Sequence, residues 1–125
     1  MMKAFAAAVL IAVLGACASL GGASMPAKFE GGMLVDSAGM TLYTFDRDTA
    51  GSGKSACNGP CIALWPALKA ADTDRASGDW SIVTRDDGSK QWAYKSKPLY
   101  LWVKDQKPGD KTGDGVNKVW HVIAQ

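Results

Sequence analysis

The stretch that decides the fold reads Leu42-Tyr43-Thr44-Phe45-Asp46-Arg47-Asp48, and its pattern returns as Leu99-Tyr100-Leu101-Trp102-Val103-Lys104-Asp105. Both copies follow the order Leu-Tyr-x-aromatic-x-basic-Asp. Successive side chains of a strand point to opposite faces, so the two aromatic residues of each copy share one face. The aspartate follows at the point where the strand is expected to end. The repeat therefore predicts two copies of one strand-to-turn unit, related by pseudo-symmetry.

The aromatic positions of the repeat are candidates for packing or for binding. Duplicated positions usually reproduce packing, so we interpret Tyr43, Phe45, Tyr100 and Trp102 as core side chains whose tyrosine hydroxyls find a polar partner near the surface. The alternative is a platform on which a glycan or an apolar ligand stacks.

The two aspartates of the repeat, Asp48 and Asp105, have a structural interpretation of their own. A carboxylate just after a strand accepts backbone N–H groups and starts a turn. We expect both side chains to form turns or to accept a tyrosine hydroxyl, with contact to a ligand as the alternative.

Other short apolar runs surround the repeat and are rich in aromatic and β-branched residues, as strands are. Turn signals at Asp36–Gly39 and Arg85–Ser89 predict two hairpins. Helical character is confined to Ile62–Ala71, where Pro66 limits it to a turn or two, and Gly109–Asn117 is a turn-rich loop. The strand candidates are Met33–Val35, Met40–Phe45, Trp80–Thr84, Gln91–Lys95, Leu99–Val103 and Val119–Ile123.

These elements predict an all-β fold of about six to eight short antiparallel strands in a single compact domain. Within that domain, which we place at 29–125, we expect two related units at about 32–72 and 80–125. A helical turn near 62–71 is the one exception to the β structure.

The N-terminus carries an export signal. A short positive start is followed by the unbroken apolar run Ala4–Val13, which is too short to span a bilayer as a stable anchor. Leu14-Gly15-Ala16-Cys17 then resembles the bacterial lipobox, after which a lipoprotein signal peptidase cleaves ahead of the cysteine. We expect a signal peptide over 1–16, a diacylglycerol on Cys17 and a small, polar tether over 17–28. The alternative is an ordinary secretory signal, and both interpretations export the protein.

The lipid itself supplies the membrane anchor, since each buried acyl CH₂ contributes roughly 0.8 kcal/mol. Ala18 rather than Asp follows the cysteine, which by the sorting rule of enteric bacteria favours the outer membrane. The chain has 125 residues, with 14 basic and 12 acidic side chains and no basic tract, so nucleic acid is not an expected partner.

Once Cys17 carries lipid, Cys57 and Cys61 remain as one pair in an oxidising compartment. The Asn-Gly-Pro segment between them bends the chain back, and a disulfide across so short a loop contributes about 2 kcal/mol in the chain-entropy model. A redox-active pair is the alternative. A copper site completed by His121, the single histidine, is another, although Ile62 stands where the copper-delivery pattern expects proline.

Several motifs together resemble a family of secreted bacterial lipoprotein repeats with a Tyr-x-(Phe/Trp/Tyr)-x-x-Asp motif. The resemblance covers about 34–122, and it implies export and a repeated β unit but no established activity. Besides the two motif copies it is carried by Cys57-Asn58-Gly59-x-Cys61, Leu64-Trp65-Pro66-x-Leu68, Asp87-Gly88, Gln91-Trp92-Ala93-Tyr94-Lys95, Lys97-Pro98-Leu99-Tyr100, Pro108-Gly109-Asp110, Gly113-Asp114-Gly115 and Val119-Trp120-His121.

Catalytic and metal-binding patterns are sparse. With a single histidine and no Gly-x-Ser-x-Gly elbow, hydrolytic triads and zinc hydrolysis have little support. Asp110 and Asp114 are four apart with no closing Glu, so we expect a plain turn and not a calcium loop. Gly53-Lys54-Ser55 ends like a phosphate-binding loop, but Asp48 stands where that motif requires glycine.

The sequence thus predicts an envelope-anchored lipoprotein without catalytic activity, cofactor or metal, whose β domain binds or scaffolds an envelope protein or a glycan. A redox or copper-handling protein using Cys57 and Cys61 is the rival. A glycan-binding module using exposed aromatic residues such as Trp102 is the third hypothesis.

Overall fold

The structure, a computed structural model, describes residues 25–125 of the chain. The predicted signal peptide, the lipid-accepting Cys17 and most of the tether lie outside the described residues. Among residues 25–125, no helix has the length and apolar character needed to cross a bilayer.

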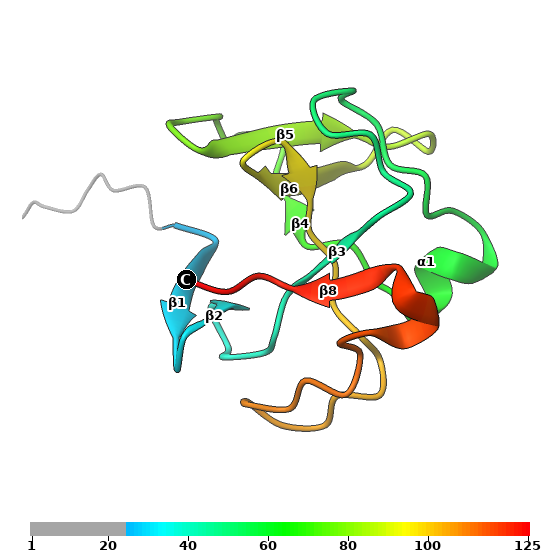
Figure 1. The fold of residues 1–125 in the computed structure, drawn as a ribbon. Coiled ribbons are helices and arrows are strands. Elements are labelled where there is room, and N and C mark those ends of the chain that lie inside the picture. Colours follow the sequence, from blue (N-terminus) through cyan, green and yellow to red (C-terminus); the bar gives the residue numbers. More distant parts are fainter. Residues whose placement is uncertain (1–24) are drawn as a thin grey trace, which may run out of the picture.

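The first two strands form a hairpin at one end of the domain (Figure 1). Strand β1 (Ala27–Glu30) pairs antiparallel with β2 (Met33–Asp36). Gly31 and Gly32 connect them with φ of 62° and 85°, as a two-residue type I′ turn requires. Ala27 is buried, so the folded domain begins two residues before the boundary expected from the sequence.

The centre of the domain holds the first copy of the motif. Strand β3 (Tyr43–Phe45) pairs antiparallel with the C-terminal strand β8 (Trp120–Val122), so two segments far apart in the sequence meet in one small sheet (Figure 1). On the other side of β3, the backbone groups of Tyr43 and Tyr100 exchange two hydrogen bonds of 2.8 and 3.0 Å.

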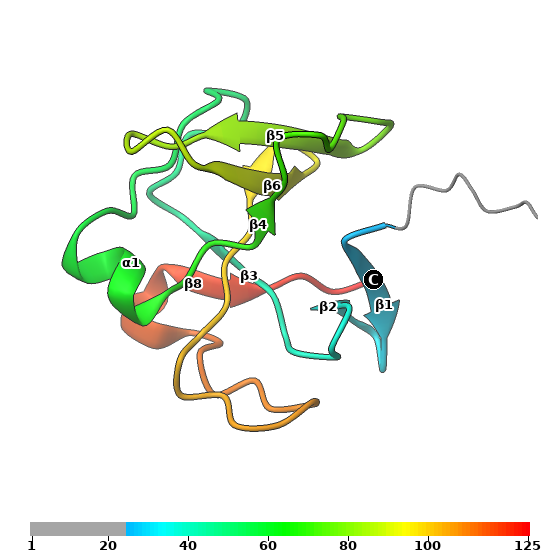
Figure 2. The same cartoon turned by 180° about the vertical axis from the view of Figure 1, so that it is seen from behind.

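A further sheet lies at the top of the domain as drawn and packs against the β1–β2 hairpin (Figure 2). Its strands run in the order β4 (Lys69–Ala70), β6 (Lys90–Tyr94), β5 (Trp80–Thr84), and β7 (Lys97–Pro98) also pairs with β6. The predicted hairpin around Arg85–Ser89 is present, with β5 and β6 in register from Trp80 opposite Tyr94 to Thr84 opposite Lys90.

The predicted helical stretch is shorter and earlier than expected. The helix α1 covers Pro60–Leu64, while Lys69 and Ala70 belong to β4. Pro66 has no N–H and forces the preceding Trp65 out of the helical region, to φ −123° and ψ 75°, so the helix ends there. A short 3-10 helix, η2 (Val116–Lys118), precedes β8.

Two of the predicted strands, Met40–Phe45 and Leu99–Val103, change their hydrogen-bonding partners along their length. After β2, the Asp36 carboxylate accepts the N–H groups of Ala38 and Met40, which closes the predicted turn. The predicted strand Leu99–Val103 bonds in succession to Trp92, Tyr43, Pro66 and Leu64. It passes from one sheet to the other and so does not form one continuous ladder.

Two apolar clusters fill the domain. The first joins the β1–β2 hairpin to β6 and contains Ala27, Leu34, Leu42, Trp80, Trp92 and Leu99. The second is aromatic and contains Tyr43, Cys57, Trp65, Tyr100 and Trp120. The all-β class and the two related units predicted from the sequence are confirmed, with the motif tyrosines side by side where the units meet.

Candidate functional site

Each motif tyrosine is locked to the motif aspartate of the other unit. The Tyr43 hydroxyl donates to Oδ2 of Asp105, and the Tyr100 hydroxyl donates to Oδ2 of Asp48, both at 2.6 Å. Both tyrosines are fully buried. Burial, reinforced by the neighbouring carboxylate, raises the pKa of both phenols well above their usual range. The exchange of partners ties the two units together.

The same two aspartates close the loops that follow the motif. Asp48 accepts the N–H of Ala56 at 2.6 Å, and Asp105 accepts the N–H of Thr112 at 2.9 Å. Burial raises the pKa of Asp48, against the opposing effect of the Tyr100 hydroxyl. Both carboxylates therefore act as loop formers and as acceptors for tyrosine.

The second aromatic positions, Phe45 and Trp102, lie at the two ends of a four-ring stack. Phe45 stacks on Trp120 at 4.2 Å between ring centroids, Trp120 on Trp65 at 3.8 Å, and Trp65 on Trp102 at 4.0 Å. Tyr43 and Tyr100 meet Trp65 and Trp120 edge-on. Phe45 and Trp102 are half-buried, whereas the two tyrosines present no face to solvent.

The first unit is further held by a disulfide and a buried arginine. Cys57 and Cys61 are bonded to each other, as predicted, across the start of α1. Arg85 is 6% exposed and donates to Ser55, Gln91 and Asn58 and to the Cys57 carbonyl. Arg85 carried no functional signal in the sequence, because it stood in a predicted hairpin turn and most of its partners are distant in the chain.

His121 lies on β8 opposite Thr44 and forms a hydrogen bond of 2.7 Å from Nε2 to Oδ2 of Asp46. In the part of the chain that the structure describes, no three His, Cys, Asp or Glu side chains gather in a group that could hold a metal ion. In the Gly109–Asn117 loop, Asp110 accepts the N–H groups of Gln106 and Lys107, and Asp114 accepts that of Val122.

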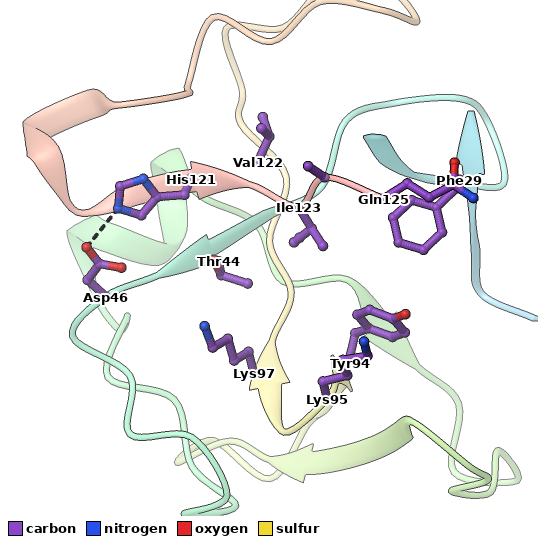
Figure 3. A pocket seen from close by; sticks show the side chains of 11 residues that line it. Phe29, Thr44, Asp46, Tyr94, Lys95, Lys97, His121, Val122, Ile123 and Gln125 are labelled. Carbon is purple, nitrogen blue, oxygen red and sulfur yellow. Dashed lines mark hydrogen bonds and ion pairs between the residues drawn. The ribbon is translucent and has the colours of Figure 1, made fainter. Parts of the chain in front are cut away.

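A groove of about 580 Å³ opens on the face of β3 and β8 that points away from the aromatic stack (Figure 3). Strand alternation explains the division, because Tyr43 and Phe45 point into the stack while Thr44 and Asp46 point into the groove. The groove is lined by Phe29, Thr44, Asp46, Tyr94, Lys95, Lys97, His121, Val122, Ile123, Ala124 and Gln125.

The ends of the groove differ in chemistry (Figure 3). At one end the rings of Phe29 and Tyr94 meet edge-on with centroids 6.0 Å apart. At the other end lies the Asp46–His121 pair, and Lys97 stands between the two ends. The combination of an aromatic end, exposed cations and a polar pair makes this groove a candidate ligand site.

Most groove residues were missed by the sequence analysis, which weighed only His121. One signal was present: if Tyr43 and Phe45 face a core, then Thr44 and Asp46 must face the other way. The remaining residues come from β1, β6, β7 and the C-terminal segment. Their meeting at one groove depends on tertiary structure that no local pattern specifies.

A scan against protein-family models matches the chain twice, at residues 28–69 and 81–124, to one family described as a secreted repeat of unknown function. The two matches contain one motif copy each. Neither the search of curated proteins nor that of solved structures finds a match.

Proposed function

The chain belongs to this family of secreted repeats of unknown function, and from that premise we propose that it is a lipid-anchored, non-catalytic binding module of the cell envelope. In this proposal acyl chains on Cys17 hold the protein at the membrane. The β domain binds a small ligand in the groove between β1, β3, β8 and the β6–β7 turn.

The anchor is supported by the sequence at the N-terminus. Cys17 follows Leu14-Gly15-Ala16 directly behind an apolar run of signal-peptide length, and the family is one of exported proteins. Two or three acyl chains suffice for stable attachment. Ala18 after the cysteine favours the outer membrane.

The groove is the observation that carries the binding function. Its volume of about 580 Å³ falls within the range of small-molecule sites, and an apolar aromatic end is combined with a few convergent polar groups. The other conspicuous residues of the domain, the motif tyrosines and aspartates, are engaged with one another in the interior.

The proposed absence of catalysis rests on the sequence, which has a single histidine and no Gly-x-Ser-x-Gly elbow. A histidine acting as general base needs a nucleophile or substrate proton within hydrogen-bond reach. Among the described residues, the His121 ring bonds to the side chain of Asp46 and to no hydroxyl or thiol. Both side chains of the pair can form hydrogen bonds with a polar ligand.

Photo-crosslinking in the native host tests the proposal. A benzophenone amino acid placed at Gln125, which lines the groove, is expected to form an adduct of defined mass in intact cells. The matched control places the same amino acid at Lys104, which is exposed and outside the groove. No adduct at Gln125, or equal yields of the same adduct at both positions, would contradict a ligand-binding groove.

A further inference from the structure

Resting on the proposed function, we infer that the ligand of the groove is a saccharide that bears a carboxylate. Three features of the groove carry this inference: cations without a carboxylate partner, an aromatic end beside hydroxyl-binding groups, and a strained turn that presents one of the cations.

The cations are Lys95 and Lys97, on the turn between β6 and β7. Both are exposed, and no carboxylate of the described residues lies within 4.0 Å of either ammonium group. Asp46, the one acidic side chain of the groove, is bonded to His121. The Lys95 ammonium lies over the Tyr94 ring, 5.5 Å from its centroid, so Lys97 is the ammonium group that provides a site for a carboxylate of the ligand.

The aromatic end and the strand face suit a sugar ring. The C–H face of a pyranose is apolar and packs on an aromatic ring such as Phe29 or Tyr94, both half-buried at this end of the groove (Figure 3). Sugar hydroxyls need acceptors and donors, which the second carboxylate oxygen of Asp46 and the Thr44 hydroxyl supply on the strand face.

The exposure of the groove to solvent favours a sugar over a fatty acid as its ligand. Nearly half of the lining residues are exposed, among them Asp46, Lys95, Lys97 and Gln125. A long acyl chain in so open a groove would leave much of its apolar surface in water. A polar ring with hydroxyl groups has no such penalty.

The β6–β7 turn holds Lys95 in a backbone conformation that residues other than glycine rarely adopt. Lys95 and Ser96 have φ of 50° and 72°, and a two-residue loop with two positive φ values is a type I′ turn, which favours Asn-Gly. The β1–β2 hairpin makes the same kind of turn with Gly31-Gly32. Strained non-glycine residues cluster at functional sites, and here the strain places a cation at the groove rim.

An NMR titration of the full, lipidated protein in detergent tests the ligand class, with trigalacturonate as the probe and its fully methyl-esterified form as the neutral match. Trigalacturonate is expected to shift the amide signals of Thr44, Lys97 and His121 and their neighbours. The ester is expected to bind at least about tenfold more weakly, since a charge-assisted hydrogen bond is lost.

A matched pair of variants locates the carboxylate. Lys97→Met keeps most of the length of the side chain but removes its charge, and is expected to weaken trigalacturonate binding about tenfold. Lys104→Met removes another exposed lysine, outside the groove, and is expected to leave the affinity unchanged. Both positions are on the surface, so the dispersion of the amide spectrum verifies that each variant is folded.

Three results would overturn the inference: equal affinity for the acid and its ester, no loss on Lys97→Met, or inorganic phosphate binding as tightly as trigalacturonate. The crosslinking experiment separates these from a failure of the proposed function. An adduct at Gln125 in cells together with no trigalacturonate binding would make the ligand class wrong and leave the binding function standing.

Discussion

At the scale of single residues, the motif works as a reciprocal lock. Tyr43 depends on Asp105 and Tyr100 on Asp48, so each unit supplies the acceptor that the other needs. The sequence predicted that the aspartates accept tyrosine hydroxyls. It did not predict that the pairs cross between the units, because a repeat alone does not tell which copy faces which.

Removing one tyrosine hydroxyl tests the lock. Tyr43→Phe is expected to lower the free energy of unfolding by about 1–3 kcal/mol, because the buried Asp105 loses a donor. Tyr100→Phe should have a similar effect through Asp48. Urea denaturation measures both, and Tyr94→Phe is the control, since the Tyr94 hydroxyl has no hydrogen bond within the described residues. Losses no larger than that of the control would contradict the lock.

The two phenols also predict how stability depends on pH. Their pKa values are raised in the folded state, so the folded protein holds protons that the unfolded chain releases above about pH 10. Stability is therefore fully present below about pH 10 and is expected to fall as the pH rises further. Urea midpoints measured across this range should fall less steeply for Tyr43→Phe, and an equal slope would argue against the assignment.

Gly113 tests the aromatic stack. A Cβ at this position would lie 2.7 Å from Cη2 of Trp65 and 3.0 Å from Cγ of Trp102, although its φ is not in the left-handed region. Gly113→Ala is expected to cost about 3 kcal/mol and to change the near-UV circular dichroism of the stacked tryptophans. Gly53→Ala, where the added methyl meets open space, should cost about 1 kcal/mol from its φ alone. Equal losses of unfolding free energy for the two variants would show that the stacked rings shift at little cost to make room for the added methyl group.

At the scale of elements, turn residues predict the observed structure better than strand propensity does. The β5–β6 hairpin was predictable because Asp87 and Gly88 mark its turn. The strand from Leu99 to Val103 was predicted as one element but changes partners along its length, which only the neighbouring segments determine. The helix was placed too far along the chain, because the apolar run past Pro66 serves β4 and the core.

A double substitution in the β6–β7 turn is expected to raise the stability of the fold and to weaken ligand binding. Lys95→Asn with Ser96→Gly installs the residues that a type I′ turn prefers and is expected to raise the free energy of unfolding by about 1 kcal/mol. The same variant removes a groove cation and should weaken trigalacturonate binding.

The reverse exchange is the control for this prediction. Gly31→Lys with Gly32→Ser puts the strained pair into the β1–β2 turn and is expected to destabilise the fold by about 1–2 kcal/mol while binding is unchanged. A β6–β7 variant that is less stable than the natural chain would remove the case for strain at the groove rim.

At the scale of the whole molecule, the groove is lined by residues from both units. The motif tyrosines and aspartates bond to one another inside the domain, and the repeat made these positions visible in the sequence. The groove lies where the symmetry breaks: Asp46 of the first copy faces His121, whereas the second copy has the exposed Val103 at the equivalent position. Positions that repeat in the sequence predict the residues that hold the domain together. The groove residues differ between the two copies, so only the folded structure brings them together.

The central claim, a membrane-anchored domain that holds a ligand, is tested most directly by a native mass spectrum of the protein extracted from the envelope of its own host. We expect a chain that begins at Cys17 with fatty-acid mass added, together with a non-covalent ligand that is released on activation. Thr44→Trp, which fills the groove floor, should keep the lipid and lose the ligand. A chain without fatty acid, or a Thr44→Trp variant that retains the same bound mass, would contradict the account.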